Sequence, residues 1–268
     1  MTLDPTAQAL GAQIDRLAPT RRPEGRPVGH QRWRALLFLH WPVPVEVLRP
    51  LVPVGLELDT FEGVAYVGLV PFAMRRVRPW WSPERVAFDF LETNVRTYVH
   101  VEGQDPGVYF FSLDASSRVA VAVARRQFGL PYYNGRMSLI RSGDELSYRC
   151  RRLGELGPRS FVRAVPGTYL GPSEPGSIEH FLLERYILHV EGRDGLMQGR
   201  VHHTPYPVQK ARVLELGDEL VAAAGFPRPH TSPLVHYAAG VDVDIFRLRH
   251  RDAASDSTRY VRPPRRRE

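Results

Sequence analysis

Polar side chains that could bind and protonate a small acid occupy every second position of one segment. Residues 91–101 read as a strand, in which alternation separates a polar face from an apolar one. A carboxylate, an amide, a guanidinium and a phenol on one face can bind a carboxylate-bearing substrate and transfer one proton. The same pattern is typical of a solvated strand face with cross-strand charge pairs. The polar set is Glu92, Asn94, Arg96, Tyr98 and His100.

The elements after this strand carry further cations. We predict a strand, a helix, a helix stop and a strand at Val108–Ala115, Ser117–Phe128, Gly129–Pro131 and Tyr133–Ser142. Arg125 and Arg126 stand in the last turn of that helix, where the helix dipole favours cations whatever their function. Arg125 is therefore a second candidate, beside Arg96, for binding a carboxylate.

The histidines and the cysteine do not form a recognisable metal or nucleophile motif. His202 and His203 are adjacent on a predicted strand, so their side chains point to opposite faces and cannot bind one ion together. Zinc-site spacings and the G-x-S-x-G nucleophile elbow are both absent from the sequence. Cys150 has basic neighbours but no visible base partner. We expect no metal ion and no cofactor.

The excess of basic residues lies at the two ends of the chain. The net charge is +7, of which residues 1–34 contribute +3 and residues 249–268 contribute +4. The stretch between them is neutral, with 23 basic and 23 acidic side chains. Arginine-rich tails are typically solvated, although they can contact nucleic acid non-specifically. We expect no specific nucleic-acid partner.

The sequence favours a cytoplasmic protein without a membrane partner. No apolar run approaches the roughly 20 residues of a membrane helix, and the first residues lack the layout of a signal peptide. The single cysteine cannot form an internal disulfide. The adjacent Trp80 and Trp81 can cover a pocket mouth or a subunit contact, which leaves a homo-oligomer open.

Ten or more short strands, a few short helices and mostly hairpin-length connections favour one antiparallel α+β domain. The polar face of residues 92–100 predicts a cone or half-closed barrel with a wet interior. A linker rich in Pro, Arg and Gly covers residues 19–29. We therefore predict a flexible N-terminal arm at residues 1–29, the domain at 30–248 and a disordered basic tail at 249–268.

Five motifs, in order along residues 30–248, resemble the YqjF-like family of uncharacterised proteins. They are ETNVRTYV (92–99), GVYFFSLDA (107–115), LPYYNGRM (130–137), VHHTPYP (201–207) and HYAAGVDVDIF (236–246). That family is grouped with acetoacetate decarboxylase. The resemblance therefore implies an acetoacetate decarboxylase-like fold, in which an antiparallel sheet curls into a cone around a central cavity.

The resemblance also bears on the chemistry. The decarboxylase uses a lysine Schiff base, with the lysine pKa lowered by an adjacent lysine and a dry cavity. The resemblance places Arg125-Arg126 where the family has its lysine pair, and Glu92 closest to the family's catalytic carboxylate. Arginine cannot form the imine because its guanidinium stays protonated. Lys210, the only lysine, lies outside the matching motif. We therefore do not expect Schiff-base decarboxylation.

These observations predict a domain that binds a small organic acid or carbonyl metabolite in a central cavity. Glu92 and Arg125 are the candidate catalytic residues, with Glu92 positioning a proton or a water. One alternative is a cofactor-free acid–base enzyme that catalyses enolisation, hydration or lactone opening. Another is a structural or interaction protein whose polar strand face is merely wet. The candidate substrate-binding residues are Arg96, Asn94, Tyr98, Tyr132 and His202.

Overall fold

The computed structural model describes residues 14–155, 157–192 and 195–250, whose strands form one thirteen-stranded sheet. The strands are β1 Gly29–Val43, β2 Glu57–Leu58, β3 Ala65–Pro79, β4 Phe88–Val101, β5 Gln104–Ala115, β6 Tyr132–Ser142, β7 Glu145–Arg152, β8 Arg159–Gly171, β9 Ile187–Gly192, β10 Gly195–His202, β11 Val208–Asp218, β12 Leu234–Ile245 and β13 Arg249–His250. The α-helices are α1 Val45–Leu48, α2 Arg118–Phe128 and α3 Ile178–Leu183. Short 3-10 turns lie at Ala18–Thr20, Arg49–Leu51, Glu84–Val86 and Ala222–Ala224.

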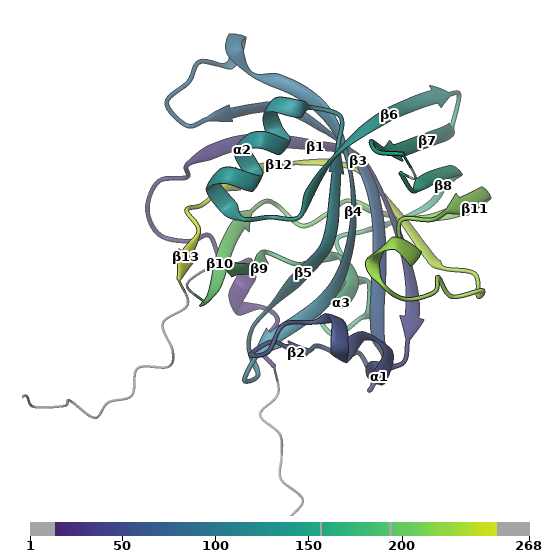
Figure 1. Ribbon diagram of the computed structural model, residues 1–268, viewed down its shortest axis with the longest axis horizontal. Helices are drawn as coiled ribbons and strands as arrows, with labels where there is room; N and C mark the ends of the chain where they lie inside the picture. The colour runs from purple at the N-terminus through teal and green to yellow at the C-terminus, as the bar shows by residue number, and fades with distance from the viewer. Residues whose placement is uncertain (1–13, 156, 193–194, 251–268) are drawn as a thin grey trace, which may run out of the picture.

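The sheet closes on itself twice. Pairing of β4 with β5 completes a ring that runs through β6, β7, β8, β11, β12, β1 and β3. A second ring forms because β5 also pairs with β9, and β10 with β12. The two rings share β12, β1, β3, β4 and β5, which form a common wall. Figure 1 shows β9 and β10 to the left of β4 and β5, and β6, β7, β8 and β11 to the right.

The common wall is covered on both sides, so its strands bury both of their faces. On β1, Leu37 and Leu39 pack in one hydrophobic cluster, whereas Leu36 and Phe38 pack in another. The first cluster is shared with β7 and β8, and the second with α2, α3 and β10. This arrangement explains why alternating side chains of β4 are buried equally, although antiparallel sheets often leave one face in water.

The predicted class, an α+β domain with a curled sheet and a few short helices, is confirmed. The sheet is not wholly antiparallel, because β5 pairs in parallel with β6 and with β9. Parallel neighbours need a crossover connection, and α2 provides it between β5 and β6. β2 pairs with β4, because both edges of β3 are occupied by β1 and β4.

Helix α2 begins and ends where its sequence signals predict. The Ser117 hydroxyl accepts a hydrogen bond from the Ala120 N–H at 3.2 Å and caps the first turn. Gly129 ends the helix at φ 63°, a left-handed conformation that favours glycine. Val121 is buried in the core, whereas Val119 is largely exposed. The helix therefore covers one end of the second ring with a single apolar stripe.

Part of the predicted N-terminal arm packs against the domain. Arg16 pairs with Asp59, which is fully buried and also binds Arg185 at 2.7 Å. A buried carboxylate needs such partners because burial without them is costly. Residues 249–250, which were assigned to the tail, form β13 beside β10. The rest of the predicted arm and tail, residues 1–13 and 251–268, lies outside the described residues.

Candidate functional site

The polar face of β4 points into the ring that β9 and β10 close. Glu92 is 2% exposed and Arg96 is 8% exposed, and Asn94, Tyr98 and His100 are also buried. A solvated strand face is therefore the wrong interpretation for these residues. The polar groups instead lie among the apolar side chains of the ring interior, where each unsatisfied group carries an energetic cost.

Glu92 and Tyr132 form a hydrogen-bonded pair in this interior. The Tyr132 hydroxyl donates to Glu92 Oε2 at 2.7 Å. Burial raises the pKa of Glu92 to about 7, and hydrogen bonds from Tyr132 and Asn94 offset part of that rise. The pKa of Tyr132 is raised well above its usual value by burial and by the neighbouring carboxylate. Glu92 is therefore poised to hold or release a proton near neutral pH.

Arg96 is a buried cation without an acidic partner in the described part of the chain. Its guanidinium donates to the carbonyl of Leu182, just before the end of α3, at 3.0 Å, and to the Tyr98 hydroxyl at 3.5 Å. It also lies 5.7 Å from the ring centroids of Phe38 and Tyr98, at cation–π distance. Its Nε has no hydrogen-bond partner among the described residues. A buried guanidinium in this state can accept a carboxylate ligand without displacing a carboxylate of the protein.

The hydrogen-bond directions around Tyr98 follow from its partners. A carbonyl can only accept, so the Tyr98 hydroxyl donates to Leu182 O at 2.8 Å. His40 Nε2, 2.6 Å from the same hydroxyl oxygen, must then be the donor of that contact. The pKa of His40 is well below its usual value, first because of burial and then because of Arg96. His40 is thus neutral, and its Nδ1 is an acceptor without a partner among the described residues.

Gly68 on β3 provides the space that this arrangement needs. A Cβ atom at Gly68 would lie 3.0 Å from His40 Cδ2 and 3.4 Å from Arg96 Cγ. Both side chains therefore pack directly over the glycine backbone. A residue without a side chain at this position lets the strands carrying His40 and Arg96 present both groups to the same interior.

The structure separates Arg125 from the interior group. Arg125 is exposed on α2, and its Nε donates to the backbone carbonyl of Tyr132 at 2.5 Å. Its guanidinium also lies 5.6 Å from the Tyr133 ring centroid. Tyr132 donates to the Glu92 carboxyl group, and Arg125 binds the backbone carbonyl of Tyr132. Arg125 therefore holds the backbone of the Tyr132–Tyr133 segment from outside.

His202 also lies apart from the β4 group. It is half-buried at the end of β10 and borders a cavity of about 360 Å³, whose lining residues do not include Glu92 or Arg96. The space that borders Glu92 is only about 10 Å³, roughly the room for one water molecule. The β4 group is therefore packed, and the larger space lies elsewhere.

His40 and the Leu182 carbonyl complete the interior group, and sequence patterns do not indicate either of them. His40 is 58 residues from Tyr98 in the chain, and no motif connects the two.

Lys210 is exposed on β11. No group of three or more His, Cys, Asp or Glu side chains within residues 14–155, 157–192 and 195–250 is placed to hold a metal ion. None of the helices in those ranges is long and apolar enough to cross a bilayer.

Comparison with known sequences places the chain among proteins without an assigned activity. Residues 30–242 match the family model DUF2071, described as an uncharacterised conserved protein. The uncharacterised protein YqjF of Bacillus subtilis (strain 168) is 38% identical over 228 residues. That match covers 85% of this chain and 94% of YqjF.

Solved structures of low sequence identity share the fold. The enduracididine biosynthesis enzyme MppR, complexed with pyruvate, is 13% identical with a TM-score of 0.60, covering 84% of this chain and 91% of MppR. An acetoacetate decarboxylase from Legionella pneumophila is 14% identical with a TM-score of 0.55, covering 93% and 98% of the two chains. A second acetoacetate decarboxylase structure is 18% identical with a TM-score of 0.57, covering 85% and 89%. The acetoacetate decarboxylase-like fold expected from the sequence is confirmed.

Proposed function

The chain belongs to the DUF2071 family, and from the interior of its acetoacetate decarboxylase-like fold we propose that it binds a small organic acid or carbonyl metabolite. The proposed site is the polar face of β4, with Glu92, Asn94 and Arg96 at its centre. One structural neighbour is described as complexed with pyruvate, which is a ligand of this class.

The unpaired Arg96 is the observation that carries this proposal. Taking a guanidinium out of water costs several kcal/mol unless an anion or a full set of hydrogen bonds compensates it. Arg96 has one backbone carbonyl, a long hydrogen bond of 3.5 Å to the Tyr98 hydroxyl and two aromatic rings, but no acid, and its Nε is unpartnered among the described residues. A bound carboxylate would supply the missing negative charge and accept from Nε.

Hydrogen-bond acceptors close to Arg96 further restrict the class of ligand. His40 Nδ1 and Asn94 Oδ1 are buried and have no partner in the described ranges. Both accept hydrogen bonds, so the ligand would present a hydroxyl, an enol or a bound water to them. A hydroxy acid or an enolisable keto acid has both a carboxylate and such a donor.

Glu92 favours turnover as a second candidate function. A carboxyl group with a pKa of about 7 can donate or accept a proton at neutral pH, as enolisation, hydration or lactone opening requires. Imine chemistry does not fit this interior, because the chain has one lysine and Lys210 is exposed on β11. A Schiff-base lysine needs a desolvated position or a neighbouring cation to lower its pKa.

Ligand entry requires side chains to move. The space beside Glu92 holds about one water, which is smaller than any organic acid. Helix α3 is the element whose displacement would free both Arg96 and Tyr98, because both donate to Leu182 O. We expect binding to shift this helix and to replace Leu182 O with an oxygen of the ligand.

Incubating the protein with a panel of small keto, hydroxy and unsaturated acids, followed by proton NMR, tests the proposal. Broadened but persistent ligand signals would show binding, and consumed signals would show turnover. The variant Arg96→Met should abolish both responses. A panel without any broadening or consumption, at ligand concentrations up to about 10 mM, would overturn the proposal. At that concentration even a ligand with a Kd of about 1 mM would occupy most of the protein.

A further inference from the structure

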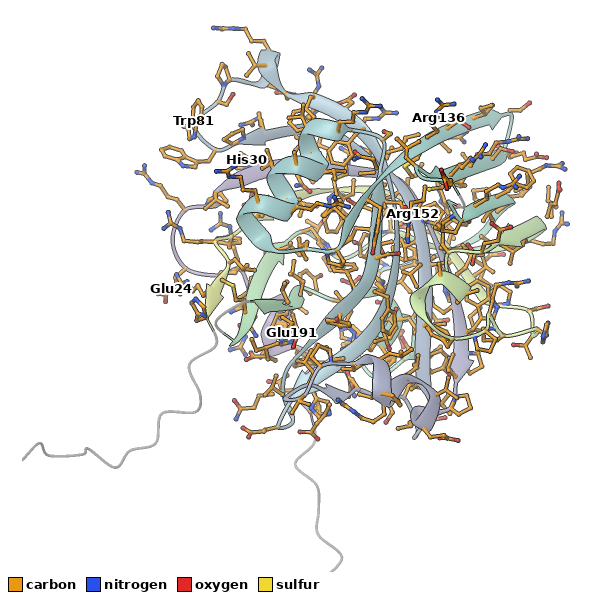
Figure 2. All side chains as sticks on the ribbon, viewed as in Figure 1. Glu24, His30, Trp81, Arg136, Arg152 and Glu191 are labelled. Carbon is orange, nitrogen blue, oxygen red and sulfur yellow. The ribbon has the colours of Figure 1, made fainter. Side chains whose placement is uncertain are left out.

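The cavity of about 360 Å³ lies where β1 begins and β3, β10 and β12 end. His30 marks its position, on the left of the view below Trp81 (Figure 2). Its volume falls in the range of small-molecule sites. His203 and Tyr206 pack between this cavity and the β4 group: the two rings are 4.6 Å apart, and Tyr206 contacts Phe38 at 5.4 Å. The cavity is thus separate from the site of the proposed function.

Two carboxylates of the lining are already shared between arginines. Glu84 lies 3.2 Å from the guanidinium of Arg32 and 3.6 Å from that of Arg76. Asp242 lies 3.6 Å from Arg32 and also pairs with Arg34. The single negative charge of each of these acids is therefore divided between two guanidinium groups.

The rest of the cluster has more cations than acids. Asp244 pairs with Arg22 at 2.9 Å and with His30 at 2.8 Å. Arg78 has no acidic partner among the described residues, and its guanidinium reaches only the Ser82 carbonyl, at 3.3 Å. The lining has three arginines and three acids, and two further arginines, Arg22 and Arg34, pair with its acids from outside, which makes five guanidinium groups for three carboxylates. The formal excess is two positive charges, with the three histidines of the lining, His30, His202 and His203, counted as neutral.

His203 lines the same cavity and carries a buried acceptor. It is 3% exposed, and its ring stacks on Tyr186 with centroids 4.5 Å apart. Nδ1 lies 2.7 Å from the Thr204 carbonyl, which can only accept, so Nδ1 is the donor. Burial lowers the pKa of His203 to about 4, so the ring is neutral at pH 7. Its Nε2 is an acceptor without a partner in the described part of the chain.

We propose that this cavity binds a small dianion that also carries a hydroxyl hydrogen, with hydrogen phosphate as the simplest member. The dianion would match the excess of two positive charges, and the Arg78 guanidinium has the fork geometry that phosphate oxygens accept. The P–OH group would donate to His203 Nε2. A phosphate monoester dianion offers the same charge, and it carries a hydroxyl hydrogen when its alcohol part has a free hydroxyl group, as in glycerol phosphate.

Calorimetric titration at low salt with inorganic phosphate and with sulfate tests the site. Sulfate has the same charge and shape but no hydrogen to donate, so phosphate should bind at least about tenfold more tightly if His203 accepts the P–OH hydrogen. Arg78→Gln and Arg32→Gln should each weaken phosphate binding about tenfold. Arg75→Gln is the matched control, because Arg75 is also on β3 but pairs with Asp89 outside the lining.

The outcomes separate the parts of the proposal. Failure of phosphate to bind, or equal weakening in the Arg75 and Arg78 variants, would overturn the site. Equal affinity for phosphate and sulfate would overturn the assignment of His203 as the acceptor. A parallel titration with glycerol phosphate distinguishes the source: tighter binding than inorganic phosphate supports a phosphoester ligand, and weaker binding supports the free ion.

Discussion

The Tyr132 hydroxyl donates to Glu92 Oε2 at 2.7 Å, although the two residues are 40 positions apart in the chain. This bond stabilises the ionised form of a carboxyl group that burial holds protonated. Replacing Tyr132→Phe should therefore raise the pKa of Glu92 above its value of about 7. An NMR titration of the carboxyl carbon of Glu92 measures this change directly. A pKa that stays constant or falls in the variant would show that the hydroxyl does not act on Glu92.

The pKa of Glu92 also predicts how stability depends on pH. Folded Glu92 keeps its proton up to about pH 7, whereas in the unfolded chain it ionises near 4.5. The folded state binds more protons between these values, so this group makes the free energy of unfolding fall as pH rises from 4.5 to 7. The total loss is about 3 kcal/mol. Above pH 7 the contribution is constant.

Urea unfolding of the wild type and of Glu92→Gln, at several pH values from 4 to 8, measures this contribution. Asp114 and Glu184 also have raised pKa values because of burial, so the difference between the two proteins is the relevant quantity. We expect that difference to change between pH 4.5 and 7 and to level off above. A difference that is independent of pH would contradict the pKa assigned to Glu92.

Arg185 and Arg96 are two buried arginines near Tyr98. Substitution by methionine should lower the free energy of unfolding at Arg185 but not at Arg96. Arg185 pairs with Asp59, so Arg185→Met leaves a buried carboxylate poorly compensated. It should cost about 3 kcal/mol, at the low end for such a loss because Arg16 still pairs with Asp59. Arg96→Met removes an unpaired buried cation, and should leave the free energy of unfolding unchanged or raise it by about 1 kcal/mol.

Chemical denaturation of both variants without ligand checks this contrast. The sign for Arg96 is the informative quantity, because a structural arginine would lose stability on truncation. A loss above about 2 kcal/mol for Arg96→Met would indicate that Arg96 serves the fold and not a ligand.

Gly68 gives a test of the packing around His40. Gly68→Ala would place a Cβ atom 3.0 Å from His40 Cδ2, and should cost about 1–3 kcal/mol through overpacking. Gly217→Ala is the control, because a Cβ there has no atom within 4 Å and the strand position is exposed. That variant should change stability by less than about 0.5 kcal/mol. Equal thermal midpoints for the two variants would mean that His40 does not pack over Gly68.

Local patterns predicted the elements well but not their burial. The alternation of residues 91–101 and the signals at Ser117 and Gly129 correspond to β4 and α2 as observed. The sequence could not show that both faces of β4 are covered. That depends on the pairing of Val108 with Leu188, which are 80 residues apart and share no local pattern.

The same limit applies to the site. Glu92, Asn94, Arg96 and Tyr98 share a face because of strand periodicity, and this could be predicted. The partner of Tyr98 is His40 on β1, a strand that pairs with β3 and is separated from β4 by it. Arg125 shows the same limit in another way. Its place near the end of a helix is predictable, but the direction of its side chain depends on tertiary packing.

The affinity of the protein for a small keto or hydroxy acid, with and without the Arg96 guanidinium, tests the central claim most directly. The best ligand of the NMR panel would be titrated into the wild type, into Arg96→Met and into Arg136→Met, whose arginine is exposed on β6 (Figure 2). We predict a loss of at least tenfold for Arg96→Met, about 1.4 kcal/mol or more, and unchanged binding for Arg136→Met. Equal dissociation constants for all three proteins would contradict the assignment of the β4 interior as the binding site.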